Sequence, residues 1–183
     1  MDALERIEAA TAVCGEAVNG VKTDQLTNAT PCTEFNVKEL LRHIIGGLQM
    51  LQTAASGGKA EMPPEDLVGN NPAAQYEEGR TKLIATLREP GVFDKTWSMP
   101  FGDMPGKMMA GIAFMEHLTH AWDVKKATGQ DPNLPEDLVN ECLGFITPMD
   151  AMLRMPGVCG PALEVPDSAS PTEKLVAFMG RQP

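Results

Sequence analysis

Apolar residues recur at helical spacing over most of the chain, and Pro or Gly interrupts each run. The first run covers roughly residues 3–18 and stops at Asn19-Gly20, a common helix terminator. In the second run, NVKELLRHIIGGLQMLQTAASGG, Asn36 is placed to cap a helix, and Glu39 can bond back to that cap. The pattern therefore predicts two long helices early in the chain.

Turn-forming residues mark the next boundaries. Residues 56–70 are typical of a loop. A third helix is predicted from Asn71-Pro72 through AAQYEEGRTKLIATLR, and Pro90-Gly91 ends it. The segment FDKTWSMPFGDMP combines alternating polarity with a Gly-Asp turn, which predicts a short hairpin.

A long helix and two further helices complete the pattern. The long helix extends over about 107–128 and ends at Gly129, and another helix begins at Pro135. The segment SPTEKLVAFMG contains a capping box of Ser170 and Glu173 and a Gly stop. Four long helices with short connections favour an all-α fold, an up-and-down four-helix bundle with an appended hairpin and extra C-terminal helices.

Two polar residues interrupt the apolar stripe of the long helix. At 100° per residue, one face holds Met109, Ile112, Ala113, Glu116, His120, Val124 and Ala127. A lone carboxylate buried in such a stripe would be costly. In the second helix His43 borders the apolar arc and is expected to face inward as well. Two imidazoles and one carboxylate would therefore converge from two helices.

A divalent cation would satisfy these three groups together. Glu116 and His120 are four residues apart, so both can bind one ion, and with His43 they leave a position for water or substrate. Two alternatives stay open: a hydrogen-bonded pair of Glu116 and His120 with His43 at a helix border, or joint binding by His117 and His120. We favour packing or a supporting role for His117. Asp123 either accepts the ring N–H of His120 that the metal does not use, or pairs at the surface with Lys125 or Lys126.

Composition narrows the class of protein. The chain has 183 residues, and no repeat or long linker divides it, so we expect one domain over 1–183. Its formal charge of −10, without a Lys/Arg run, opposes binding to nucleic acid or an anionic membrane. The start MDALERIEAA lacks the pattern of a secretory signal, and the four cysteines form no CxxC, so we expect a cytoplasmic protein with reduced cysteines.

Three segments resemble one known family. TPCTEFNVKELLRHIIGG and EHLTHAWDVKKATGQ resemble signatures of the mycothiol-dependent maleylpyruvate isomerase N-terminal family of the DinB-like superfamily, and SPTEKLVAFMGRQP resembles the ending of small actinobacterial members. The resemblance implies a four-helix bundle with a metal triad at His43, Glu116 and His120. The spacing of these residues points to the same set.

The resemblance also suggests an activity. Related members use the metal to activate a low-molecular-weight thiol such as mycothiol. The isomerases carry a further C-terminal domain for which this chain has no room, so we expect a thiol-dependent transferase, with a metal-dependent hydrolase or a metal-binding protein without catalysis as alternatives. Zn²⁺ is the first choice of ion, while Ni²⁺, Fe²⁺ or Mn²⁺ would also accept these ligands.

The expected partners are a small-molecule thiol and an electrophilic substrate, with a homodimer left open. Polar parts of the thiol need a binding group in a cleft beside the metal. Arg42, Arg80 and Arg154 are the candidates, and the sequence does not distinguish among them.

Overall fold

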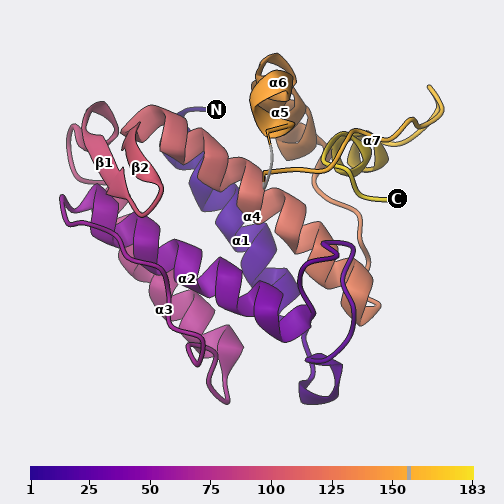
Figure 1. Cartoon of the computed structure of the whole chain (residues 1–183), viewed down its shortest axis with the longest axis horizontal. Coiled ribbons are helices and arrows are strands. Elements are labelled where there is room, and N and C mark those ends of the chain that lie inside the picture. Colours follow the sequence, from indigo (N-terminus) through magenta and orange to yellow (C-terminus); the bar gives the residue numbers. More distant parts are fainter. Residues whose placement is uncertain (156–157) are drawn as a thin grey trace.

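The computed structural model describes residues 1–155 and 158–183, and most of these residues are helical. Four long helices pack on one another, α1 against α3 and α4, and α2 against α3 and α4 (Figure 1). Their bounds are Ala3–Asn19 for α1, Val37–Ala55 for α2, Pro72–Leu87 for α3 and Gly106–Thr128 for α4. The expected all-α class is confirmed, with one small sheet added to it.

Side-chain caps begin the helices where the sequence predicts. The Asn36 side chain accepts the backbone N–H of Glu39, and the Glu39 carboxylate accepts the backbone N–H of Asn36, which closes the predicted box at the start of α2. Ser170 and Glu173 form the same reciprocal pair at α7. Asn71 caps α3. These bonds satisfy N–H groups that have no partner inside a helix.

The predicted hairpin is present, but its turn lies two residues earlier than expected. Strand β1 (Thr96–Met99) pairs antiparallel with β2 (Gly102–Pro105), and Met99 lies opposite Gly102. Pro100 and Phe101 therefore make the turn, and Gly102 begins the second strand. The φ of Gly102 is 121°, a backbone region that favours glycine, so this residue is needed for its conformation rather than for a Gly-Asp turn.

Helix α4 is covered on both sides. On one side lie α1, α2 and the hairpin, and on the other side lie α5 (Glu136–Ile146) and α7 (Pro171–Phe178) (Figure 1). The Phe145 ring of α5 sits over Gly111 of α4, where a Cβ atom would come within 2.2 Å of the ring. Short elements connect these helices: η1 (Thr23–Gln25), η2 (Val92–Asp94), η3 (Thr147–Met149) and α6 (Asp150–Leu153).

Because α4 is enclosed, polar residues on several of its faces are buried. They are His117, Thr119, His120 and Asp123. Burying an unpaired polar group is unfavourable, yet two of their atoms, Nε2 of His117 and the hydroxyl of Thr119, have no hydrogen-bond partner among the described residues. The part of the chain that the structure describes contains no helix long and apolar enough to cross a bilayer.

The cap of α2 can be tested by mutation. Replacing Asn36 with Ala removes the acceptor for the Glu39 N–H, and we expect the free energy of unfolding to fall by about 1 kcal/mol. Urea denaturation followed by circular dichroism measures this change. Lys38→Ala, at an exposed position in the same turn, serves as the control and should change stability by less than about 0.5 kcal/mol. Equal effects of the two substitutions would contradict the role of the cap.

Candidate metal centre

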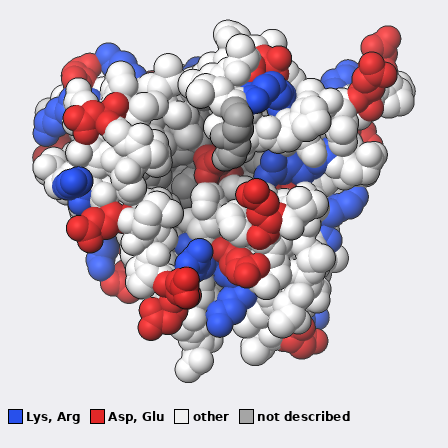
Figure 2. Space-filling view, in the orientation of Figure 1, with Lys and Arg blue, Asp and Glu red and all other residues white. Residues whose placement is uncertain are grey.

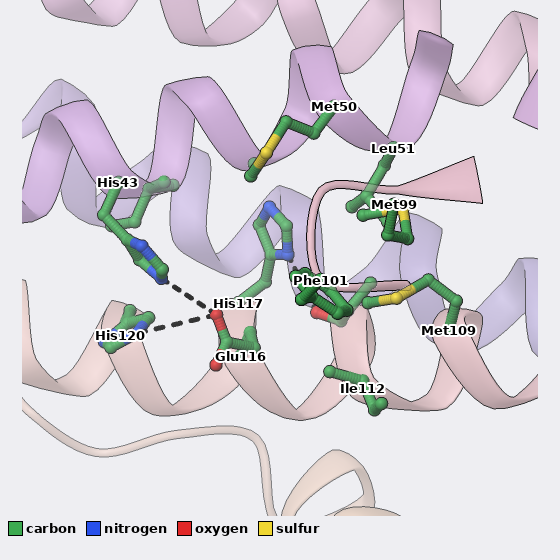
Figure 3. Close-up of a pocket in the computed structure, with 13 residues that line it drawn as sticks. His43, Met50, Leu51, Met99, Phe101, Met109, Ile112, Glu116, His117 and His120 are labelled. Carbon is green, nitrogen blue, oxygen red and sulfur yellow. Dashed lines mark hydrogen bonds and ion pairs between the residues drawn. The ribbon is translucent and has the colours of Figure 1, made fainter. Parts of the chain in front are cut away.

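Three of the predicted residues meet between α2 and α4. His43 projects from α2, and Glu116 and His120 project from successive turns of α4 (Figure 3). The Nε2 atom of His43 lies 2.9 Å from Oε2 of Glu116, and Nε2 of His120 lies 3.9 Å from the same oxygen. One ligand atom from each side chain lies within 4.8 Å of the other two. The structure thus brings together the three residues that both helical stripes indicate.

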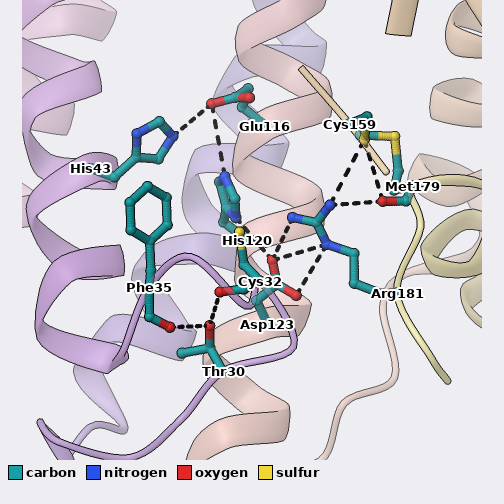
Figure 4. Close-up of polar contacts among 10 residues, drawn as sticks. All are labelled: Thr30, Cys32, Phe35, His43, Glu116, His120, Asp123, Cys159, Met179 and Arg181. Carbon is teal, nitrogen blue, oxygen red and sulfur yellow. Dashed lines mark hydrogen bonds and ion pairs between the residues drawn. The ribbon is translucent and has the colours of Figure 1, made fainter. Parts of the chain in front are cut away.

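A carboxylate fixes the orientation of His120. Its Nδ1 atom lies 2.9 Å from Oδ2 of Asp123 (Figure 4). Because a carboxylate accepts, Nδ1 donates the proton, and Nε2 is the ring nitrogen that faces Glu116. Nε2 of His120 and Oε2 of Glu116 lie 3.9 Å apart, which is beyond hydrogen-bond distance. A divalent cation would satisfy both, so the donor set fits such an ion.

The Asp123 carboxylate is itself held by an arginine from the C-terminal segment. Asp123 is fully buried, and the Nη2 atom of Arg181 lies 3.0 Å from its Oδ2 atom (Figure 4). The Arg181 guanidinium also donates to the carbonyl of Met179 at 2.8 Å, and its side chain is 11% exposed. Burial disfavours a charged arginine, but the Asp123 charge outweighs this and raises the pKa of Arg181. The alternative of a surface pair between Asp123 and Lys125 or Lys126 is therefore wrong.

The charges at the cluster are strongly coupled. Burial opposes ionisation of Glu116, but the hydrogen bond from His43 and the neighbouring imidazoles outweigh it and lower the Glu116 pKa to about 2. Burial likewise opposes protonation of His43, yet the bond to Glu116 raises the His43 pKa. Phe35 stacks on the His43 ring, with 5.4 Å between the ring centroids. A cation that binds here must displace the proton shared by His43 and Glu116.

His117 points away from this cluster and bonds to its own helix. Its Nδ1 atom donates to the carbonyl of Ala113 at 2.8 Å, and burial lowers the His117 pKa to about 4. The ring is therefore neutral at pH 7 and lies in a cavity wall beside the cluster. In this structure its position fits the expected packing or supporting role rather than joint ligation with His120.

Cys32 belongs to a second group that could in principle hold an ion. One atom each from Cys32, His120 and Asp123 lies within 4.8 Å of the others. Burial raises the pKa of Cys32 to about 11, so its thiol is protonated at neutral pH when no ion is bound, and an ion would have to displace that proton. Asp123 is already neutralised by Arg181. We favour the first group as the candidate cation site, because its carboxylate is not paired with an arginine among the described residues.

Two cavities meet at the cluster, and His43, Glu116 and His120 line both of them. The larger, of about 490 Å³, has a mixed polar wall that includes Cys32, Thr33, Glu34, Thr119, Cys159 and Arg181. The smaller, of about 210 Å³, is walled mainly by apolar side chains of α2, α4 and the hairpin (Figure 3). We call them the polar cavity and the apolar cavity.

The charged surface around the sites is mixed. Figure 2 shows one face hollowed near its centre, with an acidic side chain in the hollow and with Lys and Arg scattered among Asp and Glu. Such a mixture offers no broad basic surface on this face to a nucleic-acid backbone.

The polar cavity contains an arginine that the sequence did not single out. Arg42, Arg80 and Arg154 are not among the residues that line either cavity, whereas Arg181 lines the polar one. Arg80 pairs with Glu77, and Arg154 pairs with Asp150. The segment GRQP contains Arg181, but no local pattern indicates that its side chain reaches Asp123, 58 positions earlier.

The protein is thus helical, and three residues that could bind a cation, His43, Glu116 and His120, lie at the wall shared by two cavities. Residues 7–125 match the family described as the mycothiol maleylpyruvate isomerase N-terminal domain, and the chain belongs to this family. Two uncharacterized proteins of Mycobacterium tuberculosis, from two strains, are each 30% identical to it over 184 residues, which cover 99% of this chain and 98% of each relative. No solved structure matches the chain. The residues that match the family, 7–125, include the three cluster residues and Asp123 but not Arg181.

The cluster predicts a defined metal content. Protein purified without chelators is expected to carry about one divalent ion per chain, and His43→Ala, Glu116→Gln and His120→Ala should each lose it, because three ligands are needed to hold the ion. Elemental analysis of the purified variants measures this.

Matched variants make the assignment specific. Glu34→Gln removes another carboxylate of the polar cavity, and Cys32→Ser removes the thiol of the second group; both should keep the ion. Full occupancy in Glu116→Gln together with loss in His117→Ala would instead establish the pair of His117 and His120 as ligands.

Arg181 is expected to control metal affinity without touching the metal. In Arg181→Ala the Asp123 carboxylate loses its counter-charge and no longer holds His120 in one orientation, so we expect affinity for Zn²⁺ to fall about 10–100-fold. Competition with a chromogenic chelator measures the affinity. Arg181→Lys should recover part of the loss, and Lys174→Ala, at an exposed site on α7, should have no effect. A folded Arg181→Ala protein with unchanged affinity would refute this role.

Proposed function

We propose that this chain is a divalent-metal-dependent transferase that joins a thiol, mycothiol, to an electrophilic substrate on a single DinB-like domain. One observation carries the proposal: the three candidate ligands lie at the wall shared by two cavities, so both reactants can reach one ion. The description of the family supports mycothiol as the thiol.

A bound divalent cation would lower the pKa of a coordinating thiol and so provide a thiolate nucleophile at neutral pH. His43, Glu116 and His120 would hold the ion, with Zn²⁺ as the first choice. The protein's own groups orient these ligands: Asp123 accepts the Nδ1–H of His120, and Arg181 neutralises Asp123. The anionic charge of Glu116 offsets part of the positive charge of the ion.

The polar cavity suits the thiol. Its volume of about 490 Å³ is more than twice that of the apolar cavity, and Arg181, Thr33 and Glu34 offer donors and acceptors for polar groups. The buried hydroxyl of Thr119 has no hydrogen-bond partner among the described residues and lies in the same wall. In this proposal Arg181 binds the polar part of the thiol, a role for which the sequence suggested Arg42, Arg80 or Arg154.

The proposed transfer conserves atoms and charge. The thiol loses its proton, its sulfur forms a bond to the electrophilic carbon, and the leaving group departs with the electron pair of the broken bond. The products are a thioether and the leaving group, and the proton passes to solvent or to the leaving group. No oxidant or reductant is needed.

The exposure of the cluster favours chemistry over storage. The Glu116 side chain is 40% exposed and borders both cavities, so ligands can approach the site. A storage or structural site is usually closed by a fourth protein ligand. A hydrolase would use water at the same place, and the test below separates the two enzymatic readings.

Cobalt substitution tests the proposal directly. Adding mycothiol to the Co²⁺-loaded protein is expected to produce a sulfur-to-metal charge-transfer absorption, because sulfur replaces water near the ion. The Zn²⁺ protein should then conjugate electrophiles in a thiol-dependent reaction.

His120→Ala serves as the negative control, and a thiol analogue with serine in place of cysteine should give no band. Turnover of esters or amides without thiol would establish the hydrolase instead. Absence of both the band and thiol-dependent conversion in fully metallated protein would refute the transferase.

A further inference from the structure

The apolar cavity differs in kind from the polar one. Its volume is about 210 Å³, and the three cluster side chains lie at one end. The neutral His117 ring lies in the wall beside them, and the other end is lined by the sulfur, aromatic and aliphatic groups of α2, α4 and the hairpin (Figure 3). The apolar wall is formed by Ile44, Gly47, Met50, Leu51, Met99, Phe101, Met109, Ile112 and Ala113.

Charge excludes one class of ligand from this cavity. No lysine or arginine is among the described residues that line it, and its wall beyond the cluster is mainly apolar. A ligand carboxylate placed against the apolar wall, away from the cluster, would lose water without gaining a counter-charge. An uncharged ligand avoids that cost, and the flexible side chains of Met50, Met99 and Met109 can adapt to its shape.

Size narrows the class further. A dry cavity of about 150 Å³ is large enough to bind benzene. By proportion, 210 Å³ holds about eight non-hydrogen atoms, which corresponds to a substituted benzene ring or a branched alkyl group.

We infer that the apolar cavity binds the uncharged part of the electrophilic substrate, an aromatic or branched alkyl group of about eight non-hydrogen atoms, and presents the adjoining electrophilic carbon to the cluster. This inference rests on the proposed transferase and names its second substrate. The two reactants then occupy different cavities and meet at His43, Glu116 and His120.

One position controls the free volume of this cavity. Gly47 lies in its wall in the middle of α2, and a Cβ atom added there would have no atom within 4 Å other than those of its chain neighbours and its own helix backbone. A larger side chain at this position would therefore enter the cavity instead of clashing with the core. The exposed Gly144 of α5 also has no atom within 4 Å of an added Cβ, so it offers the same substitution away from the site.

Ethylbenzene, with eight non-hydrogen atoms, is the probe. In protein labelled with ¹³C at the methionine methyl groups, saturable binding should shift the NMR signals of Met50, Met99 and Met109 and leave that of the exposed Met62 unchanged. Phenylacetate, which adds a carboxylate to a similar framework, should bind at least tenfold more weakly.

The variants locate the binding. Gly47→Leu should weaken ethylbenzene binding at least tenfold, Gly47→Ala should weaken it less, and Gly144→Leu should leave it unchanged. Because Ala favours a helix more than Gly does, Gly47→Ala keeps the test valid if the Leu variant does not fold. Absence of saturable binding, equal binding of phenylacetate, or normal binding by both Gly47 variants would overturn the inference.

Turnover separates this inference from the proposed function. With mycothiol and Zn²⁺, benzyl bromide should be converted faster than iodoacetate, and Gly47→Leu should reduce only the benzyl reaction. Conversion of iodoacetate with equal efficiency would overturn the inference while leaving the transferase in place. Ethylbenzene binding without any thiol-dependent conversion would refute the transferase, and with it the role of this cavity as a substrate site.

Discussion

The buried ion pair of Asp123 and Arg181 holds the site together. Asp123 is inaccessible to solvent, so its carboxylate has to be neutralised within the protein, and Arg181 does this from a segment far along the chain. Removing one partner of such a pair typically costs about 3–5 kcal/mol, because the other charge is left buried. The same carboxylate orients His120. One interaction therefore links the position of the C-terminal segment to the direction of an imidazole lone pair.

The burial of α4 explains why its polar residues are informative. The helix is covered by α1, α2 and the hairpin on one side and by α5 and α7 on the other, so water cannot satisfy most of its side chains. Asp123 and the Nδ1 atom of His117 have found partners inside the protein. Glu116 is different, since it opens onto two cavities and, among the residues that the structure describes, its side chain forms a hydrogen bond only with His43. The candidate metal site therefore lies at the part of α4 that borders cavities instead of packing against other helices.

The sequence predicts most of the local structure because local signals determine it. The caps at Asn36 and Ser170 involve residues three positions apart, and the helical period alone places Glu116 and His120 on one face. The sequence misplaced the hairpin turn because a glycine can serve either in a turn or, as Gly102 does, at a strand position with a positive φ. The composition of the segment does not distinguish these two roles. Arg181 could not be found, because its partner is distant in sequence and an arginine near a terminus is usually solvated. The two cavities likewise depend on how α2, the hairpin and the tail pack, which no short motif encodes.

The family match ends at residue 125, yet the buried core includes residues beyond it, in α5 and α7. A fragment cut at that boundary would keep His43, Glu116 and His120 but would lose the Phe145 ring over Gly111 and the guanidinium beside Asp123. It would expose an apolar face of α4 and an uncompensated acid together, a combination that promotes aggregation. If residues up to 125 were joined to another protein, that protein would have to supply side chains that pack on α4 and a cationic group that pairs with Asp123.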